Sequence, residues 1–312
     1  MARHPADPEP HDPTGPGAAL DRRTLLRGGT VALGAMTAAA LGACSQDGPT
    51  VEGGAPQTRL SLTGVFPRDV PYVVAGAPTR LAFEVRDRAG RAVAPTGPVV
   101  MTVAVDDEQV GTQATATAHA DGVRRPYLPA TLTFPEPGTY EVVAEVDRER
   151  LRVEVQAYPR DEVGTPQIGE QLPPVETPTV ARPLLVDPVC SRVPGCGLHE
   201  KNLSNVVGRG RPVAVVSASP LYPGDDGSAE FLELVVAEAR RFPGTTFIHC
   251  ETYRNPKDVR SLADAAPGPI AEAYRLRWAP ALFVADAAGL VVARADKVVD
   301  RTELRQLLST AG

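Results

Sequence analysis

The sequence has neither a long apolar run nor a cluster of positive charge. Its apolar stretch near the N-terminus, residues 28–43, is 16 residues long, shorter than the roughly 20 residues of a typical membrane-spanning helix. Lys and Arg number 32 against 38 Asp and Glu, so the formal net charge is −6, and the basic residues are scattered singly among the acids. Because a nucleic-acid-binding surface needs a basic stripe that neutralises phosphates, nucleic acid is not an expected partner.

Cysteine is scarce as well: the chain has four, and the first, Cys44, follows the apolar stretch. Arg22 and Arg23 precede that stretch, and Leu-Gly-Ala-Cys at 41–44 ends it. The paired arginines resemble a bacterial twin-arginine signal, and the four residues at 41–44 resemble a lipobox. The resemblance implies a signal peptide over 1–43 and lipidation of Cys44 by several acyl chains, palmitate included. The alternative is a single transmembrane anchor over the same residues.

The residues after the expected cleavage site divide into segments of different composition. Residues 44–57 have almost nothing apolar to bury and are expected to form a flexible tether. Either interpretation of the N-terminus places the body of the protein at the cell membrane, on its extracytoplasmic face. Removal of 1–43 leaves the formal charge at −6, because that segment carries four basic and four acidic residues.

Residues 58–158 show the two-residue alternation of β-strands. Runs such as 80–86, 99–105 and 139–146 alternate from one residue to the next, and turns rich in Gly, Pro and Asp separate them. Short strands at regular spacing are typical of an antiparallel sandwich. We therefore expect an all-β, immunoglobulin-like domain without a nucleophile–base pair, followed by a Pro-rich linker over 159–182.

Residues 183–312 alternate between strand patterns and helix patterns. The expected elements, in chain order, are strand 212–217, helix 229–241, strand 246–250, helix 270–276, strands 281–285 and 290–295, and a last helix after Asp300. The first two strands enclose a helix and predict a parallel β-α-β unit, and the last two predict a hairpin. Asp300 and Glu303 have the spacing of a capping box.

This element order and the segment Arg-Trp-Ala-Pro-Ala-Leu-Phe-Val at 277–284 resemble the thioredoxin family. Within the segment, Pro280 matches the cis-proline that precedes the third core strand of that family. The resemblance covers about 183–312. It implies an α/β thioredoxin-like fold for this part, so the expected fold class is two domains, an all-β immunoglobulin-like sandwich followed by an α/β thioredoxin-like fold.

The catalytic motif of the thioredoxin family is missing. The family carries a cysteine pair in its first strand-to-helix loop, where the helix dipole lowers the pKa of a thiol. The corresponding loop, 217–230, has no cysteine, and Pro223 and Ser228 stand where exported, actinobacterial-type relatives carry sulfur. Acidic residues in the loop would also raise the pKa of a thiol placed there. The resemblance therefore implies a redox-degenerate site formed by Pro223, Ser228, Trp278 and Pro280.

Cys190 and Cys196 are the cysteines best placed to pair with each other. Five residues separate them, a Pro-Gly step can turn the chain between them, and an export compartment permits disulfides. We predict a structural disulfide between Cys190 and Cys196. The alternative is a soft-metal site formed by Cys190, Cys196 and His199, with or without Cys250 as a fourth ligand.

The other Cys and His residues of the body are expected to be structural. Cys250 ends an apolar strand and is expected to act as a buried hydrophobe. His249 precedes it and points to the opposite face of the strand, so the two cannot easily form a nucleophile–base pair. His119, in the sandwich, is expected at the surface. No cofactor and no catalytic residue is assigned.

These features favour a membrane-anchored binding or scaffold module over an enzyme. The expected ligand is an extracytoplasmic protein or peptide, bound as an added strand in the groove beside Trp278 and Pro280. The alternative is an extracytoplasmic thiol–disulfide oxidoreductase that uses Cys190 and Cys196.

Overall fold

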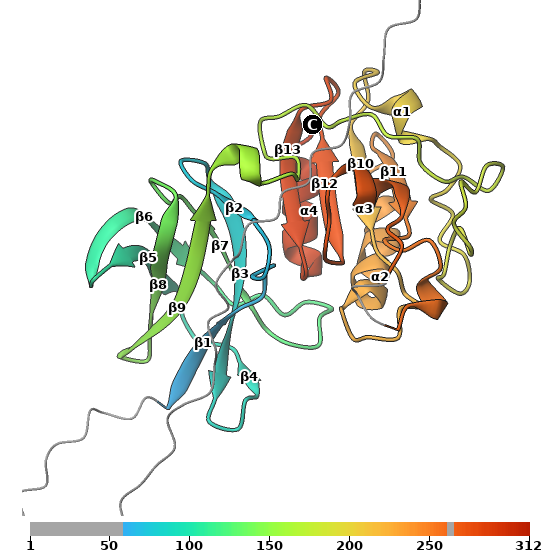
Figure 1. Cartoon of the computed structure of the whole chain (residues 1–312). Coiled ribbons are helices and arrows are strands. Elements are labelled where there is room, and N and C mark those ends of the chain that lie inside the picture. The colour runs from blue at the N-terminus through green and yellow to red at the C-terminus, as the bar shows by residue number, and fades with distance from the viewer. Residues whose placement is uncertain (1–58, 261–264) are drawn as a thin grey trace, which may run out of the picture. The chain divides into compact units, whose positions relative to one another are not determined.

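The computed structural model of the chain describes residues 59–260 and 265–312 (Figure 1). The expected signal peptide, the lipidation site Cys44 and the tether up to residue 57 lie outside the described residues. Within the described part, no helix has both the length and the apolar character that crossing a bilayer requires.

The first part of the described chain forms two β-sheets. One has the order β1–β3–β4 with β7 also paired to β3, and the other has the order β2–β9–β8–β5–β6. The bounds of these strands are β1 (Leu60–Gly64), β2 (Val73–Val74), β3 (Thr79–Asp87), β4 (Ala92–Val93), β5 (Val99–Val105), β6 (Glu108–Ala116), β7 (Leu128–Leu132), β8 (Gly138–Val146) and β9 (Glu149–Tyr158). Apolar side chains of both sheets, such as Phe83 and Met101, meet in one core. The strands predicted at 80–86, 99–105 and 139–146 are confirmed by β3, β5 and β8.

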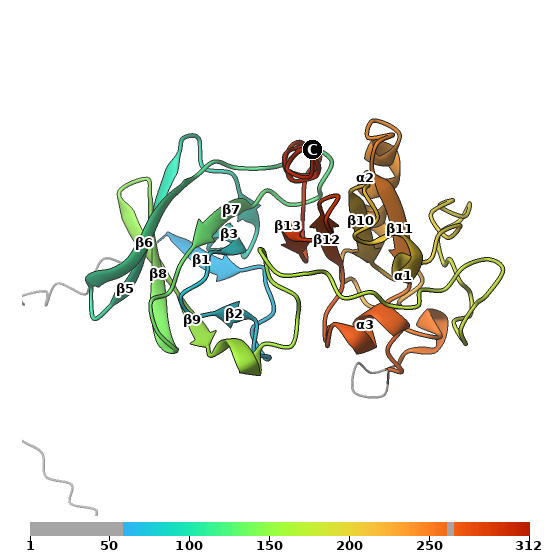
Figure 2. The same ribbon diagram turned by 90° about the horizontal axis from the view of Figure 1, so that it is seen from above.

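A third sheet follows in the chain, with the order β11–β10–β12–β13. The elements of this part are η1 (Arg160–Glu162), α1 (Leu203–Val206), β10 (Val213–Ser217), α2 (Ser228–Ala239), β11 (Thr246–Cys250), η2 (Pro256–Asp258), α3 (Pro269–Ala273), β12 (Ala281–Ala285), β13 (Val291–Asp296) and α4 (Arg301–Ser309). β10 and β11 are parallel, whereas β12 is antiparallel to both β10 and β13. Figure 2 shows α2 and α4 on one face of the sheet and α3 on the other.

The start of α4 shows how a local signal fixes the beginning of a helix. Asp300 is the N-cap, and its Oδ1 accepts a hydrogen bond from the Glu303 N–H at 2.7 Å, which satisfies a backbone donor that the helix leaves free. Glu303 does not complete the predicted capping box, because the Asp300 N–H donates to the Tyr127 hydroxyl instead, at 2.7 Å. The Glu303 carboxylate accepts two hydrogen bonds from Arg80 on β3, at 2.8 and 2.7 Å.

The third sheet packs directly against the sheets that precede it. Tyr72 lies edge-on to Trp278, with 5.4 Å between ring centroids, and its hydroxyl donates to Asp296 at 2.9 Å. One buried apolar cluster contains side chains of both parts of the chain, for example Phe83 on β3 and Phe283 on β12. The described residues accordingly form one compact unit.

Part of the segment 159–182, predicted to be an extended linker, lies along the edge strand β13. The Val291 N–H donates to the Glu170 carbonyl, and the Leu172 N–H donates to the Gly289 carbonyl, both at 2.8 Å. Leu172 is buried. The segment therefore covers a sheet edge as well as connecting two parts of the chain.

The predicted fold class, an all-β immunoglobulin-like sandwich followed by an α/β thioredoxin-like fold, is wrong. The described residues contain far more strand than helix, 35% against 14%, and the strands are spread over several sheets. Among the helices of the described residues, only α2 and α4 are longer than five residues. Element order does not fix a fold class, because it does not specify which surfaces bury one another. Here the third sheet buries part of one face, including Phe283, in the core of the sheets before it.

Candidate metal centre

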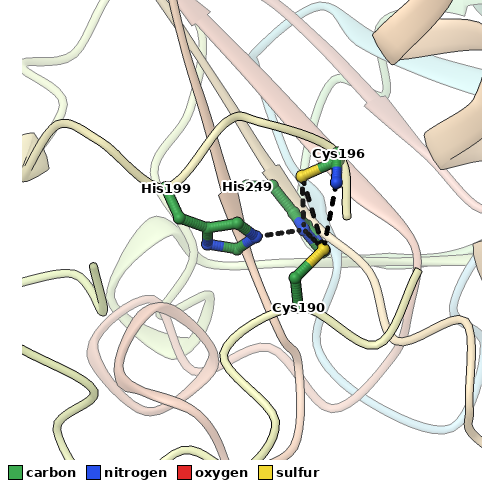
Figure 3. Close-up of side chains that lie close together, drawn as sticks. All are labelled: Cys190, Cys196, His199 and His249. Carbon is green, nitrogen blue, oxygen red and sulfur yellow. Dashed lines mark hydrogen bonds between the residues drawn. The ribbon is translucent and has the colours of Figure 1, made fainter. Parts of the chain in front are cut away.

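Two cysteines and two histidines come together beside β11 (Figure 3). Cys190, Cys196 and His199 lie in the segment before α1, and His249 lies on β11. One ligand atom from each residue, a sulfur or a ring nitrogen, lies within 4.8 Å of all the others. The fold thus gathers side chains that are distant in the sequence into one cluster.

His249 is oriented by a backbone carbonyl. Its ring is fully buried, and Nε2 lies 2.9 Å from the carbonyl oxygen of Ala218. Because a carbonyl only accepts, Nε2 is the nitrogen that carries the proton when the ring is neutral, and Nδ1 then has a lone pair that faces the sulfurs. Metal-binding histidines in proteins are commonly held in this way, with the outer nitrogen donating to a fixed acceptor.

His199 is held in place through the nitrogen that faces the cluster. Its Nε2 lies 3.0 Å from Nδ1 of His249, and the two rings are tilted by 61° with centroids 4.8 Å apart. Its other nitrogen, Nδ1, is buried and has no hydrogen-bond partner among the described residues. The hydrogen-bond contact of the His199 ring is therefore with the cluster, through Nε2.

The loop that carries the cysteines is tied at two points to β11 and to Glu251, the residue that follows β11. Glu251, on the same side of the strand as His249, accepts a hydrogen bond from the Ser191 N–H at 2.7 Å and one from the Ser191 hydroxyl at 3.0 Å. The His249 N–H donates to the Leu198 carbonyl at 3.0 Å. These bonds fix the chain immediately after Cys190 and between Cys196 and His199.

The two thiols shift each other's pKa in opposite directions. Their Sγ atoms lie 3.5 Å apart. The hydrogen bond from Cys196 lowers the pKa of the Cys190 thiol, although partial burial opposes this, and the same bond raises the pKa of Cys196. Burial lowers the pKa of His249, but the hydrogen bond to Cys190 and the charge of Glu251 outweigh it and raise the pKa. The cluster thus stabilises a thiolate on Cys190.

The separations fit a tetrahedral zinc ion. Zinc–ligand bonds of about 2.3 Å to sulfur and about 2.0 Å to nitrogen place neighbouring ligand atoms roughly 3.3–3.8 Å apart. Nδ1 of His249 lies 3.5 Å from the Cys196 sulfur, 3.9 Å from the Cys190 sulfur and 3.0 Å from Nε2 of His199. Shifts of a few tenths of an ångström bring these distances to the tetrahedral values, and the widest pair of the cluster, at most 4.8 Å apart, must close further.

His249, for which the sequence predicts no site, is part of the cluster in the structure. Cys250, the possible fourth ligand, is not part of it. Cys250 lies on the opposite face of β11, fully buried in the apolar core, and burial raises the pKa of its thiol. The prediction that His249 and Cys250 point to opposite faces is confirmed. The disulfide between Cys190 and Cys196 stays a prediction, since both are free cysteines here with sulfurs within reach of each other.

The residues expected to form a degenerate site do not line an open groove. Pro223 is exposed in the loop before α2, and Ser228 is the buried first residue of that helix. Trp278 is buried, its Nε1–H donates to Asp296 at 2.6 Å, and Tyr72 lies against its ring. Pro280, which follows a cis peptide bond as predicted, is buried as well. Side chains of the protein itself thus fill the space in which a peptide strand was expected.

His119 is not the surface residue that the sequence predicts. Its side chain is 13% exposed, and Nδ1 lies 2.8 Å from Oδ1 of Asp300, the N-cap of α4. It therefore takes part in the contact between the first sheets and the last helix.

Comparison with protein-family models and with curated proteins finds no match for this chain. Its function is therefore inferred from its own residues. Among the described residues, Cys190, Cys196, His199 and His249 form the one group of three or more Cys, His, Asp or Glu side chains placed to hold a metal ion.

Proposed function

We propose that this protein is a zinc-binding lipoprotein of the extracytoplasmic membrane face, and that it acts by binding rather than by catalysis. The observation that carries the proposal is the convergence of two sulfurs and two imidazole nitrogens within 4.8 Å of one another. Two thiolates and two imidazoles are a common ligand set for structural zinc.

The donor set favours zinc over the hard cations. Calcium and magnesium take oxygen ligands, and the four ligating side chains of this cluster supply sulfur and nitrogen. Thiolate and imidazole suit Zn²⁺ and Cu⁺. Zinc is the stronger assignment, because the cluster supplies two sulfurs and two nitrogens, the number and kind of ligands that structural zinc takes.

Four protein ligands favour a binding role. Catalytic zinc sites keep one coordination position open for water or substrate, whereas structural sites are closed by four protein ligands. Cys196, His199 and His249 are buried, and Cys190 is partly exposed. An ion held here has no free position at which a substrate could bind.

The cellular location rests on the N-terminal sequence. The paired arginines Arg22 and Arg23 and the lipobox-like residues 41–44 support export and acylation at Cys44. The proposed partners are therefore the membrane, through the lipid anchor, and an extracytoplasmic protein or peptide.

A second candidate function is thiol–disulfide exchange by Cys190 and Cys196. It is favoured by the 3.5 Å between their sulfurs and by the partial exposure of Cys190. An oxidoreductase would reduce insulin disulfides at a measurable rate, and Cys190→Ala would abolish that rate. The zinc-binding proposal predicts no such activity.

Zinc binding is tested on the full chain, purified in detergent with a reductant present. We expect one zinc per chain by plasma mass spectrometry after equilibration with Zn²⁺ and removal of the excess. His199→Asn and His249→Asn should each lower the affinity by at least about a hundredfold, because each removes one of four ligands. Circular dichroism checks that both variants fold.

Cys250→Ala is the matched control, because Cys250 is a neighbouring cysteine on the other face of β11. It should bind zinc as the wild type does. Reduced wild-type protein that binds no zinc, or a Cys250→Ala variant that loses it, contradicts the proposal.

A further inference from the structure

We infer that Cys190 and Cys196 hold either the zinc ion or a disulfide, so that oxidation of this pair releases the metal. The inference rests on the proposed zinc-binding function and adds a regulation of the same site. The two cysteines that the sequence predicts to form a disulfide are also two of the four members of the cluster in the structure.

The geometry permits both states with little movement. The two sulfurs are 3.5 Å apart, so a disulfide needs them to approach by only about 1.5 Å. Both belong to one loop, whose anchors to β11 are the bonds from Ser191 to Glu251 and from the His249 N–H to the Leu198 carbonyl. The loop can close the bond while the strand stays in place.

Disulfide formation removes the metal because it removes half of the ligands. A disulfide sulfur has no thiolate charge and is a poor zinc ligand. The remaining donors are the imidazoles of His199 and His249, and the buried His249 is fixed on β11 by its bond to the Ala218 carbonyl. Two neutral imidazoles fall short of the four ligands of a structural zinc site.

Access to an oxidant differs between the two cysteines. Cys190 is partly exposed and Cys196 is buried. The loop tip between them reaches solvent, since Val193 is 88% exposed. An oxidant therefore meets Cys190 first, and Cys196 lies behind it as the resolving thiol.

The reaction with hydrogen peroxide balances as follows. The Cys190 thiolate attacks one peroxide oxygen, the O–O bond breaks, hydroxide leaves, and Cys190 becomes a sulfenic acid. The Cys196 thiolate then attacks the Cys190 sulfur, the S–S bond forms, and the S–O bond breaks with loss of a second hydroxide. Two protons from solvent convert the hydroxides to water. The sulfurs give two electrons to the peroxide, and zinc leaves as Zn²⁺.

The test treats the zinc-loaded full chain, in detergent, with hydrogen peroxide. Released zinc is measured with a chromogenic chelator, and the cysteine linkage is measured by non-reducing peptide mapping. We expect bound zinc to fall about tenfold or more, with one zinc released per Cys190–Cys196 disulfide formed. Dithiothreitol followed by Zn²⁺ should restore the original occupancy.

Cys250→Ala is again the control and should release zinc to the same extent, because Cys250 is fully buried on the other face of β11. Zinc that stays bound while a peptide with the Cys190–Cys196 link appears would overturn the inference and leave the zinc site standing. The same holds if zinc is lost with Cys190 linked to Cys250, or with Cys190 oxidised to a sulfinic acid. Reduced protein that binds no zinc at all removes both this inference and the proposed function.

Discussion

Glu251 fixes the position of Cys190 without being one of the four ligands, and its Oε1 lies 3.8 Å from Nε2 of His249. It is buried, and both of its carboxylate oxygens accept hydrogen bonds from Ser191, the residue after Cys190. We expect Glu251→Ala to free this end of the loop and to weaken zinc binding by about 10- to 100-fold, the usual effect of losing an outer-shell partner. Competition with a zinc chelator measures the affinity.

The matched control is Glu272→Ala. Glu272 is an exposed carboxylate that pairs with Arg254 at 3.0 Å, and its loss should leave zinc affinity unchanged. Replacement of Ser191 by Ala, which keeps the backbone N–H bond but removes the hydroxyl bond, should have a smaller effect than Glu251→Ala. Equal affinities for Glu251→Ala and the wild type would exclude this positioning role.

Three of the four cluster residues could be predicted from the sequence as possible metal ligands, and the fourth could not. Cys190, Cys196 and His199 lie close together in the chain, so their spacing alone suggested a soft-metal alternative. His249 joins them because the loop packs on the edge of β11, and strand alternation does not show which segment covers a strand edge. Alternation did place His249 and Cys250 on opposite faces, and this is what excludes Cys250 from the cluster.

At the scale of elements, the N-terminus of α4 is where the first sheets meet the last helix. His119 and the N-cap Asp300 form a hydrogen-bonded pair at 2.8 Å, with Glu303 and Arg80 as the other charged groups that act on His119. The bond to Asp300 raises the pKa of His119 above its ordinary value. Burial would raise the pKa of Asp300, but the bonds from His119 and the backbone outweigh burial and lower it.

The two shifts define a pH window. The raised pKa of His119 contributes stability that is complete below the unfolded value of 6.5 and is lost as the pH rises through the folded value. The lowered pKa of Asp300 contributes stability that is present above 3.8 and is lost as the pH falls through its folded value. The pair is therefore most stabilising between these two ordinary pKa values.

We expect His119→Ala to reduce the free energy of unfolding more at pH 5.5 than at pH 8.5, by about 1 kcal/mol. Urea denaturation at the two pH values measures the difference. An Asp300→Asn background should remove the pH dependence, because the charged partner is gone. A loss of stability that is the same at both pH values would mean that packing against Tyr127, and not the ion pair, is the contribution of His119.

The strands and the longer helices could be predicted because their signals are local. Period-two alternation placed β5 and β8, and the Asp300 cap placed the start of α4. The pattern at 270–276 predicts a helix up to residue 276, but α3 ends at Ala273. The length of so short a helix depends on the surfaces that pack against it, and those surfaces come from distant parts of the chain.

At the scale of the whole molecule, the buried ion pair between Arg80 and Glu303 links β3 of the first sheets to α4, the helix that packs on the third sheet. Both side chains are buried, and Tyr127 also bonds to the Glu303 carboxylate. Removing one partner of such a pair leaves a buried charge uncompensated. We expect Glu303→Ala to lower the free energy of unfolding by about 3–5 kcal/mol.

Two further variants give the controls. Arg80→Met combined with Glu303→Leu removes both charges and should recover most of the loss, because paired apolar residues are often nearly neutral at such sites. Arg182→Ala removes an exposed pair with Glu176 and should change stability by less than about 1 kcal/mol. If Glu303→Ala unfolds in two separate steps, or is as stable as the wild type, the two parts do not depend on each other through this pair.

The fold class could not be predicted from the sequence because it depends on the packing of distant surfaces. Tyr72 fills the space beside Trp278, and residues 169–172 of the expected linker cover part of the edge of β13. Neither contact has a local signal: an aromatic residue near the start of a strand-rich region and a Pro-rich segment are both compatible with free-standing domains. The resemblance in element order therefore suggested an open groove that the protein fills with its own side chains.

X-ray absorption at the zinc edge, on the reduced and zinc-loaded full chain, tests the central claim most directly. A site made of Cys190, Cys196, His199 and His249 predicts two sulfur scatterers at about 2.3 Å and two nitrogen scatterers at about 2.0 Å, with the multiple scattering of imidazole rings. His249→Asn should remove the signature of one ring. A first shell of oxygen ligands only, or a spectrum with no sulfur, would contradict the assignment of this cluster as the metal centre.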